Sequence, residues 1–402
     1  VKPVLKAVRK GGDEAIRKFT WDFDGVELTD FHVSECEIQQ AVEAVEPELK
    51  SAIEAARFNI AKFHQAQFEQ SERIETMPGV TCWRKSVPIE TIGLYIPGGT
   101  SPLFSTVLML GVPASIAGCQ KVILCTPPNK NGDVHPAILY TANLVGVHQI
   151  FKIGGAQAIA AMAYGTQTVP QVHKIFGPGN QYVTAAKQLL SKDGVAIDLP
   201  AGPSEVAVVA DASADAEFVA ADLLSQAEHG SDSQVLLATD SRSLLNSVKD
   251  SVIKQLAKLP RREIAEAALQ NSKLILLKNL GEAMALINAY APEHLILMVE
   301  NPETLAEKVT NAGSVFLGKF SPESAGDYAS GTNHTLPTNG YATAYSGVSL
   351  DSFVKKITFQ KITKAGLQNI GPLVEKMAEA EGLEAHKQAI RIRLEKLLRN
   401  LF

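Results

Sequence analysis

The chain has 402 residues, of which 46% are hydrophobic and 20% charged, and its formal net charge at pH 7 is −5. This composition is typical of a soluble globular protein of two or three domains. The net negative charge excludes a basic surface for nucleic acid or anionic lipid, and no apolar run is long enough to span a bilayer. We therefore expect a small soluble substrate, without nucleic-acid or membrane partners. The four cysteines match no zinc or redox spacing and fit a reducing cytoplasm.

The first part of the chain is expected to be helical. Residues 1 to about 75 show helical periodicity, with capping-box spacing at Ser34 and Glu37. The chain begins at Val1, already in a helical pattern, so we expect that part of the natural N-terminus is missing. Residues 77–99 then show strand-forming residues interrupted by proline and glycine.

From residue 92 onward, short apolar strands alternate with helices. Helix 104–118 is followed by strand 121–128, and the same alternation continues to about residue 200. A second run of the same kind occupies residues 201–320. Apolar strands between helices predict largely parallel sheets covered on both faces, so the expected fold class is α/β with two units of similar topology. Ligands of such sheets bind past the carboxyl ends of the strands, which directs attention to the loops that follow them.

The end of the chain changes character twice. Residues 318–347 are rich in Gly, Ser, Thr and Asn and predict a long functional or disordered loop. The tail is again helical, and its last helix carries a stripe formed by His386, Ile390, Leu394, Leu397 and Leu401. Such a stripe must pack on the body of the protein or on another subunit. Four regions are therefore expected: 1–91, helical and packing with the second α/β unit; 92–200; 201–345; and the helical tail 346–402.

Gln226 and His229 form a candidate half of a metal site. They lie three residues apart in DLLSQAEHG, near the expected end of a helix at Gly230, so their side chains share one helix face. An amide oxygen and an imidazole nitrogen are both possible metal ligands. The ordinary alternative is a hydrogen-bonded helix end with a favourable charge near the dipole, and the two residues alone do not decide between them.

Further candidates lie in and around the second unit. Glu293 and His294 are adjacent at a helix–strand boundary and are a candidate acid–base pair, although a solvated junction has the same sequence pattern. Asp327 lies in a glycine-flanked loop, where a metal ligand, a helix cap and a turn residue are all possible. Residues 313–319 have phosphate-loop spacing, but Phe320 replaces the Ser or Thr that would bind magnesium. No GxGxxG fingerprint occurs, so a nicotinamide cofactor would have to bind in another way.

Taken together and in order, the motifs resemble the histidinol dehydrogenase family over almost the whole chain. They are VRKGGDEA, FDG, YIPGG, GGAQAIAA, FGPGN, DLPAGPSE, SQAEHG, APEHL, GDYASGTNHTLPT and EGLEAH. The resemblance implies NAD-dependent, two-step oxidation of L-histidinol to L-histidine through the aldehyde, the last step of histidine biosynthesis. It also implies a relation in outline to the aldehyde dehydrogenase fold, with 92–200 binding NAD and 201–345 holding metal and substrate.

The same resemblance assigns roles to residues of this chain. It implies one zinc ion per subunit, with a ligand set of Gln226, His229, Asp327 and His386. The tail is expected to cross a homodimer, so that His386 serves the partner's site. His294 is implied as the base and Glu293 as the residue that activates water. Further substrate contacts are implied at Ser204, His334 and Glu381, and NAD contacts at Tyr95, Gln157 and Asn180.

Elementary chemistry agrees with this set, although it leaves two alternatives. Two imidazoles, a carboxylate and an amide oxygen suit zinc, and manganese or cobalt would accept similar donors. One alternative function is a metal-dependent hydrolase that uses the same ligands with Glu293 and water. The other is a non-catalytic metal-binding relative with a dimerising tail.

Overall fold

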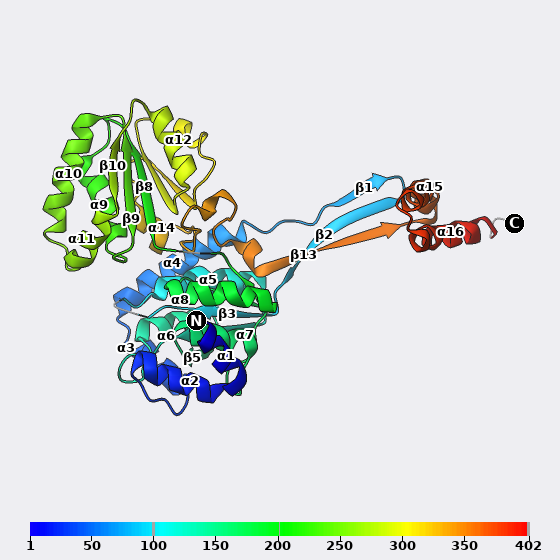
Figure 1. Cartoon of the computed structure of the whole chain (residues 1–402), viewed down its shortest axis with the longest axis horizontal. Coiled ribbons are helices and arrows are strands. Elements are labelled where there is room, and N and C mark those ends of the chain that lie inside the picture. Colours follow the sequence, from blue (N-terminus) through cyan, green and yellow to red (C-terminus); the bar gives the residue numbers. More distant parts are fainter. Residues whose placement is uncertain (99–100, 201, 400–402) are drawn as a thin grey trace. The chain divides into compact units, whose positions relative to one another are not determined.

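The computed structural model describes residues 1–98, 101–200 and 202–399. They form two compact units, the first of residues 1–67 and 89–353, the second of residues 68–88 and 354–402. Within the first unit lie two five-stranded parallel sheets, shown with their helices in Figure 1. The expected α/β class is therefore confirmed. No helix in these ranges combines the length and apolarity of a membrane span.

The N-terminal helices pack on the helices of the first sheet. They are α1 (Lys2–Gly11), α2 (Asp13–Phe19), the π-helical segment η1 (Thr20–Asp24), α3 (Glu35–Ala44) and α4 (Pro47–Gln65). Helix α1 lies on α7, α3 on α6, and α4 on α5. Leu5 and Val8 of α1 enter the core formed by the alanine-rich face of α7. The expected contact with the region 201–345 is made by α4, where the Asn59 side-chain amide donates to the Ala329 carbonyl at 2.9 Å.

The first sheet has strand order β5-β4-β3-β6-β7, and all four pairings are parallel. Its strands are β3 (Thr91–Tyr95), β4 (Lys121–Thr126), β5 (Gln149–Lys152), β6 (Lys174–Phe176) and β7 (Ala196–Ile197). The connecting helices are α5 (Phe104–Ala117), α6 (Pro136–Leu144), α7 (Gly155–Tyr164) and α8 (Gln181–Leu190), followed by η2 (Ser191–Asp193). The strand order reverses between β3 and β6, which is where such sheets bind ligands.

The second sheet repeats this topology, with strand order β10-β9-β8-β11-β12. Its strands are β8 (Glu205–Ala210), β9 (Gln234–Thr239), β10 (Lys273–Leu276), β11 (His294–Met298) and β12 (Ser314–Leu317). Its helices are α9 (Ala216–Ala227), α10 (Arg242–Leu256), α11 (Arg262–Gln270), α12 (Leu280–Tyr290), α13 (Pro302–Ala306) and α14 (Glu323–Tyr328). Val206 and Val208 face α9 and α10, whereas Ala207 and Val209 face α12 (Figure 1).

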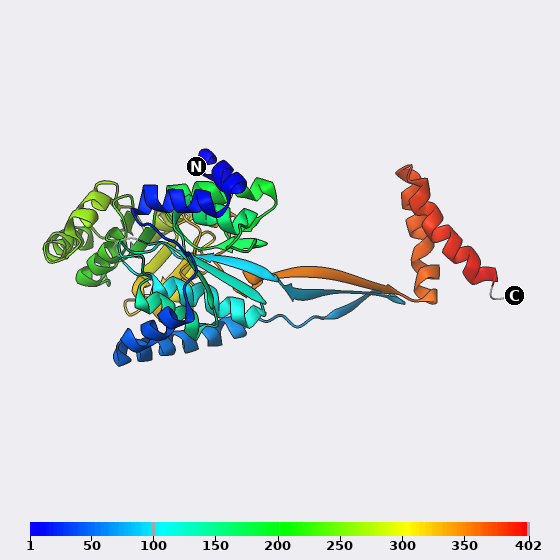
Figure 2. The same cartoon turned by 90° about the horizontal axis from the view of Figure 1, so that it is seen from below.

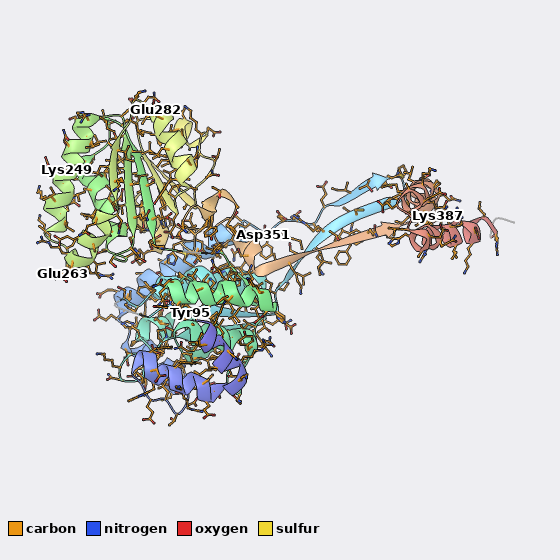
Figure 3. All side chains as sticks on the ribbon, in the orientation of Figure 1. Tyr95, Lys249, Glu263, Glu282, Asp351 and Lys387 are labelled. Carbon is orange, nitrogen blue, oxygen red and sulfur yellow. The ribbon has the colours of Figure 1, made fainter. Side chains whose placement is uncertain are left out.

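In this sheet, both faces of the central strands β8 and β11 are buried, as their uninterrupted apolar runs predict, whereas the edge strands β10 and β12 are partly exposed. The outer sides of its helices carry charge: Lys249 on α10 and Glu263 on α11 are exposed (Figure 3). The unit ends with two 3₁₀ turns, η3 (Tyr341–Thr343) and η4 (Leu350–Phe353). Residues 318–347 were expected to be irregular, but they contain α14 and η3.

The second unit is a three-stranded antiparallel sheet with a helical pair (Figure 2). Its elements are β1 (Arg73–Met77), β2 (Val80–Pro88), β13 (Val354–Ile362), α15 (Lys364–Ala380) and α16 (Glu384–Arg399). Ile390 and Leu394 of the predicted stripe pack against Gly371 of α15, where a larger residue would clash with Leu394. Leu401 lies outside the described residues, as does Gly99 of the YIPGG motif.

Candidate metal and catalytic site

Helix α9 brings Gln226 to the site. The helix begins at the Asp215 cap and ends at Ala227, three residues before Gly230, which does not adopt the expected left-handed conformation. Gln226 is 1% exposed, whereas His229 lies beyond the helix end in a turn whose backbone N–H donates to the Gln226 carbonyl. The last turn of α9 and the turn that follows it therefore place one buried amide and one exposed imidazole at the site.

Two neighbouring strands deliver the acid–base residues. His294 is the first residue of β11 and pairs with Val206 of β8, which itself begins at Glu205. The backbone N–H of Glu205 donates to Glu293 Oε2 at 2.9 Å. These residues lie at the amino ends of their strands, so the expectation that the carboxyl ends carry the site is wrong for this sheet. The reason is local: α9 runs back across the sheet, so its last turn lies beside the start of the strands.

Helix α14 adds two carboxylates. Glu323 and Asp327 are four residues apart and so project from the same helix face. Ligand atoms of His229, Glu323 and Asp327 all lie within 4.8 Å of one another, a spacing that suits a shared metal ion. Glu323 was not a predicted site residue, because the helix that places it on the same face as Asp327 was not expected from the sequence.

The hydrogen bonds of His294 define which ring nitrogen is available for proton transfer. Nδ1 lies 3.1 Å from the Glu205 carbonyl oxygen, so Nδ1 carries a hydrogen and donates it there. Nε2 therefore faces Asp327, with 3.3 Å between Nε2 and Oδ1. Burial by itself lowers the pKa of His294, but the surrounding carboxylates, Glu293 foremost, outweigh it and raise the pKa to about 10.

Burial governs the acids around it. It raises the pKa of Glu293 to about 7 and that of Glu323 to about 8. It also opposes ionisation of Asp327, but the contact with His294 and the nearby histidines keep the pKa of this carboxyl below its usual value. In this cluster, Asp327 is thus the carboxylate whose ionised form is favoured beside the His294 imidazolium, and a bound cation would favour ionisation of Glu293 and Glu323 as well.

Unpaired polar atoms support the fit of a metal ion. His294 Nε2, Glu323 Oε2 and Asp327 Oδ1 are buried and have no hydrogen-bond partner among the described residues. Buried polar atoms are normally paired, so such a group points to a ligand. The donors are imidazole nitrogen and carboxylate oxygen, a set that suits zinc.

Gln226 lies inside the same cluster. Its Nε2 lies 3.3 Å from Glu293 Oε2 and 3.5 Å from His294 Nδ1. With the amide turned over, the nitrogen donates to Glu323 Oε1 at 2.5 Å and the oxygen accepts from the Glu205 N–H at 3.0 Å. In either orientation the amide is close to the carboxylates that surround the expected metal position.

His334 connects the two sheets of the first unit. Its Nδ1 lies 2.8 Å from the Asp327 carbonyl oxygen, and its Nε2 lies 3.1 Å from the Thr106 hydroxyl on α5. The preceding Asn333 donates to the Met109 carbonyl at 2.6 Å. Burial lowers the pKa of His334, so the ring is neutral at physiological pH and its two nitrogens serve as one donor and one acceptor. Thr106 lies in an apolar helix and gave no sequence signal.

The remaining predicted residues are placed differently. Ser204 is half-buried directly before β8, next to Glu205. Glu381 and His386 are exposed residues of the second unit. The structure of the single chain thus brings together Gln226, His229, Glu293, His294, Asp327 and His334, and it leaves Glu381 and His386 outside this cluster of the first unit.

The predicted cofactor residues line a separate cavity. It has a volume of about 990 Å³ and lies at the carboxyl ends of β3 and β4, and Tyr95, Gln157 and Asn180 are among its lining residues. The Tyr95 hydroxyl, at the interior position labelled in Figure 3, accepts a hydrogen bond from the Gly155 N–H at 3.0 Å. The Asn180 side-chain oxygen caps α8, so its amide nitrogen is left to donate.

The comparisons agree with this architecture. The two sheets of similar topology define an α/β protein with the fold of aldehyde dehydrogenases. An acetylating aldehyde dehydrogenase from Geobacillus thermoglucosidasius aligns over 89% of this chain and 96% of its own, with TM-score 0.50 and 14% identity. At that identity the likeness concerns the fold alone.

The family model for histidinol dehydrogenase matches residues 1–394, and the chain belongs to this family. It is 63% identical over 397 residues to histidinol dehydrogenase of Bacteroides thetaiotaomicron, covering 99% of this chain and 93% of the relative. The relative from Vibrio parahaemolyticus is 54% identical over 402 residues, covering 100% and 92%.

A crystal structure of histidinol dehydrogenase from Elizabethkingia anophelis is 60% identical, with TM-score 0.97, and covers 98% of this chain and 91% of its own. The family resemblance expected from the motifs is therefore confirmed, and the chain is an oxidoreductase. The hydrolase and the non-catalytic relative are not favoured.

Proposed function

We propose that this protein oxidises L-histidinol to L-histidine in two steps with NAD, as the last step of histidine biosynthesis. The observation that carries the proposal is the buried cluster of His294 and carboxylates beside a metal-ligand group in a histidinol dehydrogenase fold. Residues 92–200 would bind NAD, and residues 201–345 would hold metal and substrate. A cytoplasmic location fits the four free cysteines.

The proposed metal ligands in the first unit are Gln226, His229 and Asp327, and Glu323 lies within reach of the same position. Zinc bound there would supply a fixed positive charge that orients the nitrogens of histidinol, while NAD would accept the hydride. In the proposed homodimer, His386 of the partner subunit completes the ligand set. Exposed apolar side chains in the second unit, Met377 and Leu398 among them, support an interface there.

The chain's own residues would move the protons. His294 Nδ1 is held by the Glu205 carbonyl, so Nε2 is the atom that would exchange protons with the substrate. A bound cation would lower the raised pKa of His294 and leave Nε2 free to accept the proton of the alcohol. Nε2 would return this proton to the oxygen of the hydrated aldehyde and then accept a hydroxyl proton again in the second oxidation. Glu293 has a pKa of about 7 because it is buried, so it can take a proton from water near neutral pH. Its Oε2 is positioned by the Glu205 N–H.

Ser204 and His334 would contact the substrate beside the metal, and Glu381 is proposed as a further substrate contact. His334 is held on both sides by Thr106 and the Asp327 carbonyl, so the position of its ring is determined before substrate binds. Such positioning lowers the entropic cost of reaction.

The test is NADH formation by the zinc-loaded full-length protein with L-histidinol. We expect turnover that stops on chelation and returns when zinc is added back. The same protein is assayed with ester and amide substrates in the absence of NAD. Hydrolysis of those substrates without histidinol oxidation would overturn the proposal in favour of a hydrolase, and no turnover on any of them would favour a metal-binding relative.

A further inference from the structure

A carboxylate from outside the first sheet reaches the cofactor cavity. Asp24 is the last residue of η1, and Gly25 ends this segment in the left-handed conformation with φ of 70°. Asp24 lines the same cavity as Tyr95, Gln157 and Asn180. Its Oδ2 atom is buried and makes no hydrogen bond within the described ranges.

Asp24 is half-buried, and leaving one of its carboxylate oxygens buried without a partner is costly to the fold. Burial raises the pKa of Asp24 to about 6, and no cation in the described part of the chain opposes this effect. Packing alone gives no reason for an acid here, because an amide or an apolar residue would be cheaper to bury. A ligand that donates hydrogen bonds to Asp24 would remove the cost.

Other unpaired atoms face the same cavity. Thr126 Oγ1 and Gln157 Oε1 are buried and lack hydrogen-bond partners among the described residues, and both residues line the cavity. The charge of Asp24 also reaches the Tyr95 phenol, whose pKa is raised to about 12 by burial first and by Asp24 in addition. Three segments of the chain therefore present acceptor oxygens to one space, and a polyhydroxylated ligand supplies the matching donors.

The sheet itself does not supply the acid that dinucleotide sites use. In a dinucleotide-binding sheet, an Asp or Glu near the end of the second strand accepts hydrogen bonds from a ribose. Here that strand is β4, which ends at Thr126 and is followed by Pro127 and Pro128. Asp24 lies in the same cavity as these three residues, so it can take the role from another part of the chain.

The cavity also lacks basic side chains of the kind that bind a phosphate. Its described lining contains no Lys or Arg, although Val1 and His135 belong to it, and its second carboxylate, Asp133, is exposed. A phosphate on the ribose 2′ oxygen would need a cation there and would instead meet the negative charge of Asp24.

We propose that Asp24 accepts hydrogen bonds from the hydroxyls of the adenosine ribose of NAD and excludes the 2′-phosphate of NADP. The inference rests on the proposed NAD-dependent function and names a residue that determines cofactor specificity. Thr126 and Gln157 complete the polar wall around the ribose.

The test compares wild type with Asp24→Asn and Asp24→Ser, as zinc-loaded full-length proteins, at saturating histidinol with NAD or NADP. Wild type is expected to prefer NAD strongly. Both variants should raise KM for NAD about tenfold or more, because an ionic hydrogen bond is lost, while kcat stays within about twofold. The ratio of kcat/KM for NAD over NADP should fall by at least the same factor. Asp22→Asn is the matched control and should change neither quantity, because Asp22 is an exposed acid of the same segment η1 that is not among the lining residues of the cavity.

Thermal unfolding without cofactor separates recognition from a structural role. Asp24→Asn should unfold at the same temperature as wild type or higher, because a buried charge is removed. A cofactor preference unchanged within twofold in folded variants would overturn the inference, as would wild type using NADP as well as NAD. If wild type does not use NAD at all, the proposed function fails first, and the two failures are distinguishable.

Discussion

Replacing Lys187 with methionine should both destabilise the first unit and weaken NAD binding. Lys187 is 4% exposed and forms an ion pair with the buried Asp198. Its Nζ also donates to the Gly177 carbonyl at 2.9 Å, while the Gly177 N–H donates to Asp198 at 2.8 Å. The pair thus holds both sides of Gly177, three residues before Asn180. Gly177 has φ of 123°, and a Cβ there would overlap the Tyr95 carbonyl oxygen.

The size of the destabilisation depends on the hydrogen bonds that Asp198 retains in the variant. Removing one member of a buried pair costs about 3–5 kcal/mol because the other charge stays buried. Asp198 retains the N–H groups of Gly177 and Leu199, the latter at 2.7 Å. We therefore expect the lower end, about 3 kcal/mol in the free energy of unfolding. The looser turn should raise KM for NAD more than it changes kcat, because Asn180 is proposed to contact the cofactor rather than the reacting carbon.

Urea unfolding and steady-state kinetics measure the two effects. Lys192→Met removes an exposed lysine from the following turn and should change stability by less than about 0.5 kcal/mol. The double variant Lys187→Met/Asp198→Leu should recover part of the loss, because no charge remains buried. A loss below about 1 kcal/mol for Lys187→Met, with KM for NAD unchanged, would refute this reasoning.

Three further predictions concern the catalytic residues and the core. His294→Ala should lower kcat by about 10²–10⁴-fold while leaving the zinc content unchanged, and loss of zinc would mean that His294 is a ligand. Glu323→Gln should weaken zinc binding at least tenfold in competition with a chelator, and unchanged affinity would remove Glu323 from the metal group. Phe353→Ala should lower the free energy of unfolding, measured with urea, by about 3–5 kcal/mol, because its ring stacks on the buried Phe176 with 4.3 Å between the ring centroids. A loss below about 1 kcal/mol would mean that the surrounding side chains close the cavity left by the ring.

Local sequence patterns predicted most of the secondary structure. The capping box at Ser34 and Glu37 forms as predicted, and apolar runs such as 121–126 and 205–210 are buried parallel strands. A continuous apolar run identifies such a strand, because burial on both faces leaves few polar positions in it.

These local patterns could not predict which strands pair when they are far apart in the sequence. Strand β13 pairs with β2 across more than 260 residues of sequence, with Val354 opposite Pro88 and Ile362 opposite Val80. Both strands mix charged and apolar residues without strict alternation, so neither indicates its partner.

The site was predictable in its residues more than in its geometry. Family motifs identified His294 and Asp327, but nothing local places His294 at the amino end of its strand, beside Asp327 of α14. Glu323 lay in a stretch expected to be irregular, and its i, i+4 relation to Asp327 has meaning only once α14 is known. Asp24 lies in the FDG motif, but the motif gave it no role, and only the shared cavity relates it to Tyr95.

The central claim is that one site oxidises an alcohol twice, with His294 as base and Glu293 activating water. The most direct measurement is the ratio of NADH formed to histidinol consumed by the zinc-loaded protein, with the product identified by chromatography. The account predicts two NADH per histidinol and histidine as the product. One NADH per histidinol with the aldehyde accumulating would contradict it.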